Sequence, residues 1–178
     1  SSKITNMNFM FANMYDAKEI DFSHFDTRSV TDMGRLFWKS WSLKKLDLSS
    51  FDTSKVIYMN TMFVDCYSLE EINLSSFNTG KVWYMGSMFK NTFALKNLDI
   101  HNFNTQKVTD MNNMFYGSGI KNLDLSNFNT ANVEDMSEMF NNMNNLETLD
   151  ISNFNTSKVS NFNAMFAAGS TDKLEHIY

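Results

Sequence analysis

Proline is absent from this chain of 178 residues, cysteine occurs once and glycine occurs only six times. With Cys66 alone, the chain can form neither an internal disulfide nor a cysteine-based metal site. No apolar run approaches the ~20 residues that a membrane-spanning helix needs, and no signal peptide is visible. The net charge is -5 with both signs interleaved, so there is no basic stripe for nucleic acid.

Catalytic patterns are missing as well. His24, His101 and His176 are spread along the chain, and it has no His-x-x-x-His pair, nucleophile elbow or glycine-rich phosphate loop. We therefore expect no enzyme activity, no cofactor and no metal site.

What the chain does contain is a repeat. A Phe-Asp/Asn-Thr phrase recurs with spacings of 26, 26, 26, 25 and 26 residues, at Phe25, Phe51, Phe77, Phe103, Phe128 and Phe154. A fixed period of this size predicts one structural unit stacked on copies of itself. We expect residues 1–178 to form a single solenoid of about seven ~26-residue units, with the first and last incomplete. The opening residues match the second half of a unit, so we expect the chain to be part of a longer protein.

The first half of each unit has the spacing of a strand. In the unit that begins at Leu43 it reads Leu-x-x-Leu-x-Leu-x-x-Phe. The alternation at Leu46, Asp47 and Leu48 predicts a strand with one buried face. The phrase that follows, Asp/Asn-Thr, predicts a turn bonded by its own side chains.

The second half of the unit has the spacing of a helix. Its apolar residues lie at i, i+3, i+6 and i+7, namely Val56, Met59, Met62 and Phe63. This spacing predicts one stripe of a short helix that begins about one residue after the valine, with Cys66 as a small buried side chain near the same stripe. The predicted fold class is an α/β solenoid: a right-handed array with one parallel β-sheet, a short helix per repeat and the repeated Phe residues as an internal spine.

Two irregularities test this register. One residue is missing between Phe115 and Ile120, where Gly117 and Gly119 would supply a tighter turn. Two residues are added in the loop that begins at Ala167, and the segment after this loop could form a partial cap. Uncapped ends of a solenoid expose apolar faces, so we expect end-to-end self-association.

The repeat also resembles a known family. The frame Leu-x-x-Leu-x-Leu is shared with leucine-rich repeats, and the segment from Leu46 to Phe63 closely resembles the BspA-like repeat of bacterial surface proteins. The resemblance covers essentially the whole chain and implies a leucine-rich-repeat-like solenoid at the bacterial cell surface or outside the cell, often as a lipoprotein or wall-anchored protein. It also implies adhesion or protein binding, and it carries no catalytic residues.

Aromatic residues are unevenly distributed among the repeats. They concentrate in the first half of the chain, at Trp38, Trp41, Tyr58, Tyr67, Trp83, Tyr84 and Phe93, whereas the later equivalents are mainly polar. Exposed aromatics on neighbouring units would give a large contact area for a protein or glycan at little cost in rotamer entropy. Alternatively, these side chains fill gaps between units or cover edges, and the sequence does not decide between the two.

A second candidate site is an acidic strip. The outward column of the predicted strands consists of Asp21, Asp47, Asn73, Asp99, Asp124 and Asp150. Such a strip could bind a basic peptide or divalent cations, although a flat ladder does not offer the cage of 6–8 oxygens that calcium needs. The favoured interpretation is a solubilising face whose Asp and Ser side chains bond to the adjacent unit.

Two functional hypotheses follow. The preferred one is a non-catalytic recognition or adhesion module at the cell surface, which binds a protein or glycan on another cell or in the matrix. The alternative is a structural spacer that displays another domain and has no ligand of its own. Only the aromatic asymmetry favours the first.

Overall fold

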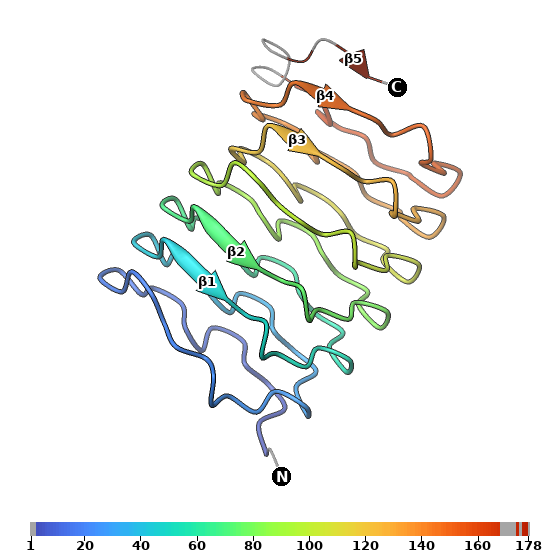
Figure 1. The fold of residues 1–178 in the computed structure, drawn as a ribbon. Helices are drawn as coiled ribbons and strands as arrows, with labels where there is room; N and C mark the ends of the chain where they lie inside the picture. Colours follow the sequence, from blue (N-terminus) through green and yellow to red (C-terminus); the bar gives the residue numbers. More distant parts are fainter. Residues whose placement is uncertain (1–2, 168–173, 175, 178) are drawn as a thin grey trace.

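Each repeat makes one circuit of a coil, and the coils stack on one another (Figure 1). The computed structural model describes residues 3–167, 174, 176 and 177. Along one side of the stack lie the short strands β1 (Lys45–Asp47), β2 (Glu71–Asn73), β3 (Asn122–Leu123), β4 (Thr148–Leu149) and β5 (His176–Ile177). The two ends of the chain lie at opposite ends of the stack.

The strands form two parallel sheets, so the prediction of one sheet is wrong. β1 pairs with β2, and β3, β4 and β5 form the second sheet in that order. The register places Leu46 beside Ile72 and Leu123 beside Leu149, one repeat apart. The coil between the sheets has no strand at its equivalent residues 97–99, which is where the ladder is interrupted.

A second ladder joins the coils through the other half of each repeat. It consists of single parallel bridges that link Asn6, Asp32, Tyr58, Tyr84, Asp110, Asp135 and Asn161 in succession. The one step of 25 residues, between Asp110 and Asp135, reflects the shortened repeat and leaves the ladder unbroken. The predicted conservation of register through this deletion is confirmed.

The predicted helix in each repeat is wrong, because the described residues contain no helix. None of them could therefore form a membrane-crossing helix. In place of i to i−4 bonds, alternate backbone N–H groups bond to the next coil. The N–H groups of Met59, Thr61, Phe63 and Asp65 donate over 2.8–3.1 Å to the carbonyls of Tyr84, Gly86, Met88 and Lys90.

Left-handed backbone positions explain how helical spacing arises without a helix. Thr61 and Asp65 have φ of 59° and 60°, and equivalent residues in other repeats do the same. In the next coil, the Met88 N–H donates to the Met85 carbonyl, and Ser87, the third residue of that turn, has φ of 58°. A positive φ at this position is typical of a type II turn. Successive turns therefore direct apolar side chains inward every three or four residues, as a helix would.

The core consists of the apolar columns that the repeat predicted. Leu46, Leu48, Met59, Met62 and Phe63 are all buried, as are their equivalents in the central repeats except Ile72 and Leu98, which are half-buried. A continuous stack of rings with centroids 5.5–6.1 Å apart runs through the core, formed by Phe11, Phe37, Phe63, Phe89, Phe115, Phe140 and Phe166. The predicted spine is confirmed for its four central residues, Phe51 to Phe128, whereas Phe25 and Phe154 are only half-buried.

Threonine hydroxyls hold successive coils together. The Thr79 Oγ1 donates to the Asn104 carbonyl over 2.9 Å and accepts the Asn104 N–H over 2.7 Å. The same two bonds recur at Thr27, Thr53, Thr105 and Thr130. Within the phrase, the Asn78 Oδ1 accepts the Gly80 N–H, so the predicted side-chain-bonded turn is confirmed.

The two glycines predicted to tighten the shortened loop do so. Gly117 has φ of 64°, and a Cβ on Gly119 would lie 2.0 Å from the Phe93 carbonyl oxygen. Only glycine therefore allows this close approach between coils. The partial cap predicted after Ala167 begins with residues 168–173, which lie outside the described part of the chain.

Candidate functional site

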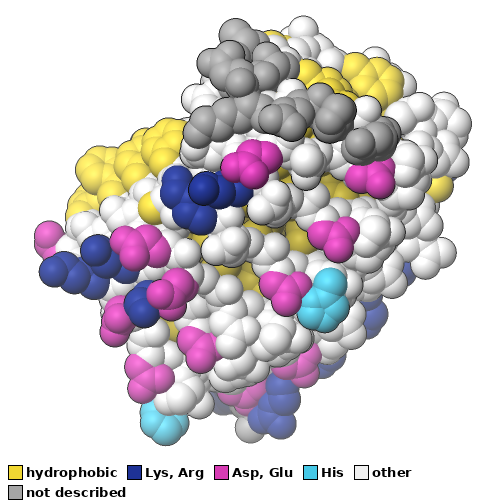
Figure 2. Space-filling model, turned by 45° about the horizontal axis from the view of Figure 1, so that its top comes forward, with side chains coloured by type: hydrophobic (Ala, Val, Ile, Leu, Met, Phe, Trp, Pro, Cys, Tyr) yellow, Lys and Arg dark blue, Asp and Glu magenta, His cyan; other side chains and the backbone are white. Residues whose placement is uncertain are grey.

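Four exposed aromatic rings line one edge of the stack, and we call Tyr15, Trp41, Tyr67 and Phe93 the aromatic row. Neighbouring ring centroids lie 4.7, 6.2 and 5.3 Å apart, and the last two pairs are stacked within 15° of parallel. Between 39% and 51% of each side chain is exposed. Figure 2 shows hydrophobic side chains gathered along one edge of the molecule. Four stacked coils thus present one continuous aromatic surface.

The local turns fix the outward direction of these rings. Trp41, Tyr67 and Phe93 each occupy the second position of a turn that precedes the strand side of the coil. These turns are closed by bonds from Leu43 to Ser40, Leu69 to Cys66 and Leu95 to Thr92, over 3.1–3.4 Å. The residue before each ring is buried, so the turn anchors its first residue in the core and leaves the ring outside.

The other predicted aromatics lie in separate groups. Tyr58 and Tyr84 stack at 5.3 Å on the bridge ladder, beside the exposed Trp83. Trp38 is half-buried, packs edge-on against Phe9 at 5.7 Å and has the Lys39 ammonium 4.4 Å above its ring. No ring pair among the described residues connects these groups to the aromatic row.

One member of the aromatic row was missing from the sequence prediction. Tyr15 lies 26 residues before Trp41, in the same column, and its ring contacts Trp41. The repeat period was the signal that could have found it.

The acidic strip is exposed, and its carboxylates close local turns. The side-chain Oδ1 of Asp47 accepts the Ser49 N–H over 3.0 Å, and each other member makes the same bond two residues along. The bonded residue is in the same coil, and Asp47 also bonds to the Asn73 side chain of the next coil, as predicted for contacts between units. Figure 2 shows acidic side chains spread over this face.

These turn bonds also set the charge of the strip. Bonds to Ser49 and Ser126 hold the pKa values of Asp47 and Asp124 below the usual 3.8, and Asp21, Asp99 and Asp150 shift in the same direction. The strip is thus charged at neutral pH. Among the described residues, no three His, Cys, Asp or Glu side chains are grouped so that they could hold a metal ion.

Cys66 is buried in the core, as predicted. Burial raises the pKa of its thiol to about 12, and its Sγ lies 3.2 Å from the Phe37 carbonyl oxygen. A thiol that stays protonated is a poor nucleophile and a poor metal ligand. Its place in the column is taken by Ser40 and Thr92, which are also buried and bonded to backbone carbonyls.

Two overlapping segments of the chain, residues 5–118 and 91–175, match the model of a family described as "Mycoplasma protein of unknown function, DUF285". The two matches together span most of the chain, and their overlap is what a repeated unit produces. No curated protein and no solved structure matches the chain.

Proposed function

The chain belongs to the DUF285 family, and we propose that it is a non-catalytic recognition module that binds a protein or glycan on another cell or in the matrix. The observation that carries this proposal is the aromatic row. Its four side chains are 39–51% exposed, although apolar side chains are buried throughout the core beside them.

The row has the physical properties of a binding surface. Aromatic side chains contribute a large contact area and are enriched where interfaces bind most strongly. Each ring is already held against its neighbour, as Tyr67 is between Trp41 and Phe93. Less rotamer freedom is therefore lost when a partner covers the row than would be lost for isolated exposed rings.

We also propose that the module is displayed at the bacterial cell surface. The support is the resemblance of the Leu46–Phe63 segment to the BspA-like repeat, whose members are surface proteins. The family described as DUF285 has no assigned function, so it supplies no ligand.

A structural spacer is the competing proposal, and one observation favours it. The rings of the row stack on one another, so each already buries part of the next without a partner. A spacer would use such contacts, like the threonine bonds between coils, to stiffen the stack.

A paired comparison separates the two proposals. The double variant Trp41→Ser/Tyr67→Ser removes the centre of the row, and Tyr58→Ser/Tyr84→Ser removes a stacked, exposed pair of similar geometry elsewhere. Binding to host cells, immobilised matrix proteins and a glycan array would be measured alongside thermal melting. We expect the first variant alone to lose binding, with similar melting of both. Absence of binding by the unmodified chain, or equal binding by both variants, would favour the spacer.

End-to-end self-association stays a prediction. Ile4, Met10 and Phe9 are 38–48% exposed in the first coil, and Phe162 is 45% exposed near the other end. Light scattering of residues 1–178 over a concentration series should show mass increasing with concentration, and a constant monomer mass at millimolar protein would contradict the prediction.

A further inference from the structure

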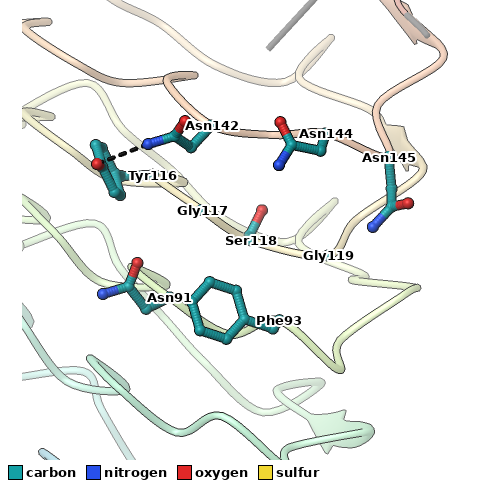
Figure 3. A pocket seen from close by; sticks show the side chains of 9 residues that line it. All are labelled: Asn91, Phe93, Tyr116, Gly117, Ser118, Gly119, Asn142, Asn144 and Asn145. Carbon is teal, nitrogen blue, oxygen red and sulfur yellow. Dashed lines mark hydrogen bonds between the residues drawn. The ribbon is translucent and has the colours of Figure 1, made fainter. Parts of the chain in front are cut away.

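The aromatic row ends beside a cavity. After Phe93, the next coil carries no aromatic side chain at this place: Ser118 is buried like Thr92 one repeat earlier, and Gly119 follows it at the place of Phe93. A cavity of about 400 Å³ opens at this point, within the size range of small-molecule sites. Figure 3 shows its lining, with the Phe93 ring on one side and the Asn142 and Asn144 side chains on the other.

The shortened loop forms the floor of this cavity. The Gly119 N–H donates to the Thr92 carbonyl over 3.1 Å, which draws the loop against the coil that carries Phe93. A Cβ on Gly117 would lie 3.3 Å from the Phe93 ring. The deletion and its two glycines therefore pull the backbone inward and leave a hollow at the place where the preceding coils carry the aromatic row.

The buried hydroxyl of Ser118 is directed into this hollow. Ser118 is only 2% exposed, and its Oγ has no hydrogen-bond partner among the described residues. Figure 3 shows Ser118 between Phe93 and Asn144, with its hydroxyl pointing towards Asn144. A buried hydroxyl without a partner is unfavourable in a folded protein, whereas a ligand hydroxyl at this place would bond to it.

The remaining polar groups of the cavity are neutral and held in place. The Asn142 Nδ2 donates to the Tyr116 hydroxyl over 2.7 Å, and the Asn91 Nδ2 donates to the Asp65 carboxylate over 2.8 Å. The described lining contains asparagine, serine, tyrosine, phenylalanine and glycine. It contains no Asp, Glu, His, Lys or Arg side chain. Amide and hydroxyl groups can both donate and accept.

We propose that this cavity binds one neutral sugar residue, with its C–H face on the Phe93 ring and its hydroxyls bonded to the Ser118 Oγ and the asparagine amides. A sugar hydroxyl donates and accepts, as these groups do, and the exposed ring offers an apolar surface for the carbon skeleton. The lining residues carry no cation for an anionic ligand, but the ammonium groups of Lys90 and Lys96 contact Tyr116 and Phe93, so an anionic sugar is included in the test. A purely apolar ligand would leave Ser118 unbonded. This inference rests on the proposed recognition function and narrows its ligand to a saccharide.

The test uses the whole chain and simple sugars. Saturation-transfer NMR would be recorded with the methyl glycosides of glucose, galactose, mannose and N-acetylglucosamine, and with glucuronate as an anionic comparison. We expect binding of at least one neutral glycoside at millimolar concentration, with the strongest transfer to ring C–H protons. Ser118→Ala should weaken this binding about tenfold, since one hydrogen bond to a buried group is lost.

Melting separates a binding role of Ser118 from a structural one. Because its hydroxyl has no partner among the residues that the structure describes, Ser118→Ala should leave the melting temperature unchanged or raise it while binding falls. Phe93→Ser should also weaken sugar binding at least tenfold. Tyr84→Ser, which removes an exposed, stacked ring that lies on the bridge ladder and does not line this cavity, is the matched control and should bind normally.

The results distinguish this inference from the broader proposal. No transfer to any neutral glycoside, stronger binding of glucuronate, or sugar binding unaffected by both Ser118→Ala and Phe93→Ser would overturn the sugar site. Partner binding that depends on Trp41 and Tyr67 but not on Ser118 would leave the recognition function standing without it. A peptide that binds in a Ser118-dependent manner would replace the saccharide as the ligand class.

Discussion

Replacing Thr79 with valine tests how the coils are joined. Thr79 is fully buried, and its hydroxyl makes two bonds to the next coil, one to the Asn104 carbonyl and one from the Asn104 N–H. Valine has nearly the same shape but makes neither bond. Leaving a backbone group unbonded costs about 1–3 kcal/mol, so losing both bonds should lower the free energy of unfolding by about 2–4 kcal/mol.

Thr79→Ser is the matched control. It keeps the hydroxyl and removes one buried methyl group, which should cost about 1 kcal/mol. Urea unfolding followed by far-UV circular dichroism and tryptophan fluorescence would give both values, provided that the slopes with denaturant agree. If Thr79→Val proves as stable as Thr79→Ser, the hydroxyl bonds do not hold the coils together and the reasoning fails.

Four further tests address other parts of the structure. Phe77→Ala should cost about 3–5 kcal/mol in urea unfolding because Phe77 is buried and stacks on Phe103, and a near-neutral result would contradict the spine. Thr61→Asn should raise the free energy of unfolding by about 0.5–1 kcal/mol, because a β-branched residue is strained at φ of 59° and asparagine is not; a loss of stability would contradict the turn geometry. Acidification below about pH 3.8 should lower the melting temperature. The folded protein holds the pKa of residues such as Asp47 below 3.8, so their ionised side chains stabilise the folded state above this pH, and this stabilisation is lost as the pH falls through the lower folded-state pKa. Burial raises the pKa of the Asp110 side chain above 3.8, so its ionised form opposes folding at higher pH. Asp110→Asn should therefore raise the melting temperature at pH 7 and raise it by less at pH 3. An equal gain at both pH values would refute a burial cost of the Asp110 charge.

The repeat made the core predictable, but not the path of the backbone. A column of identical residues must occupy equivalent places in every coil, so Leu46, Met62 and Phe63 could be assigned to the interior from the period alone. The spacing of Met59, Met62 and Phe63 also fits a helix, and side-chain periodicity does not report where backbone bonds go. The positive φ of Thr61 could not be predicted from the sequence, because β-branched residues rarely adopt it.

The candidate site was predictable in part for the same reason. Trp41, Tyr67 and Phe93 share a column, so their proximity followed from the period, and the structure adds their stacking. Trp38 and Tyr58 belong to other columns, and only the coil geometry shows that they lie in separate groups. The cavity at Ser118 could not be predicted, because it depends on how closely the shortened loop approaches Phe93.

The most direct test of the recognition function is the accessibility of Trp41 when a partner is bound. Trp38→Phe/Trp83→Phe leaves Trp41 as the only tryptophan, and Trp38→Phe/Trp41→Phe leaves Trp83, which is exposed to a similar degree. Acrylamide quenching of each variant would be measured with and without the matrix protein or glycan that binds the unmodified chain. We expect the partner to protect Trp41 and to leave Trp83 as accessible as before. Unchanged quenching of Trp41 in the bound chain would show that the aromatic row is not the recognition surface.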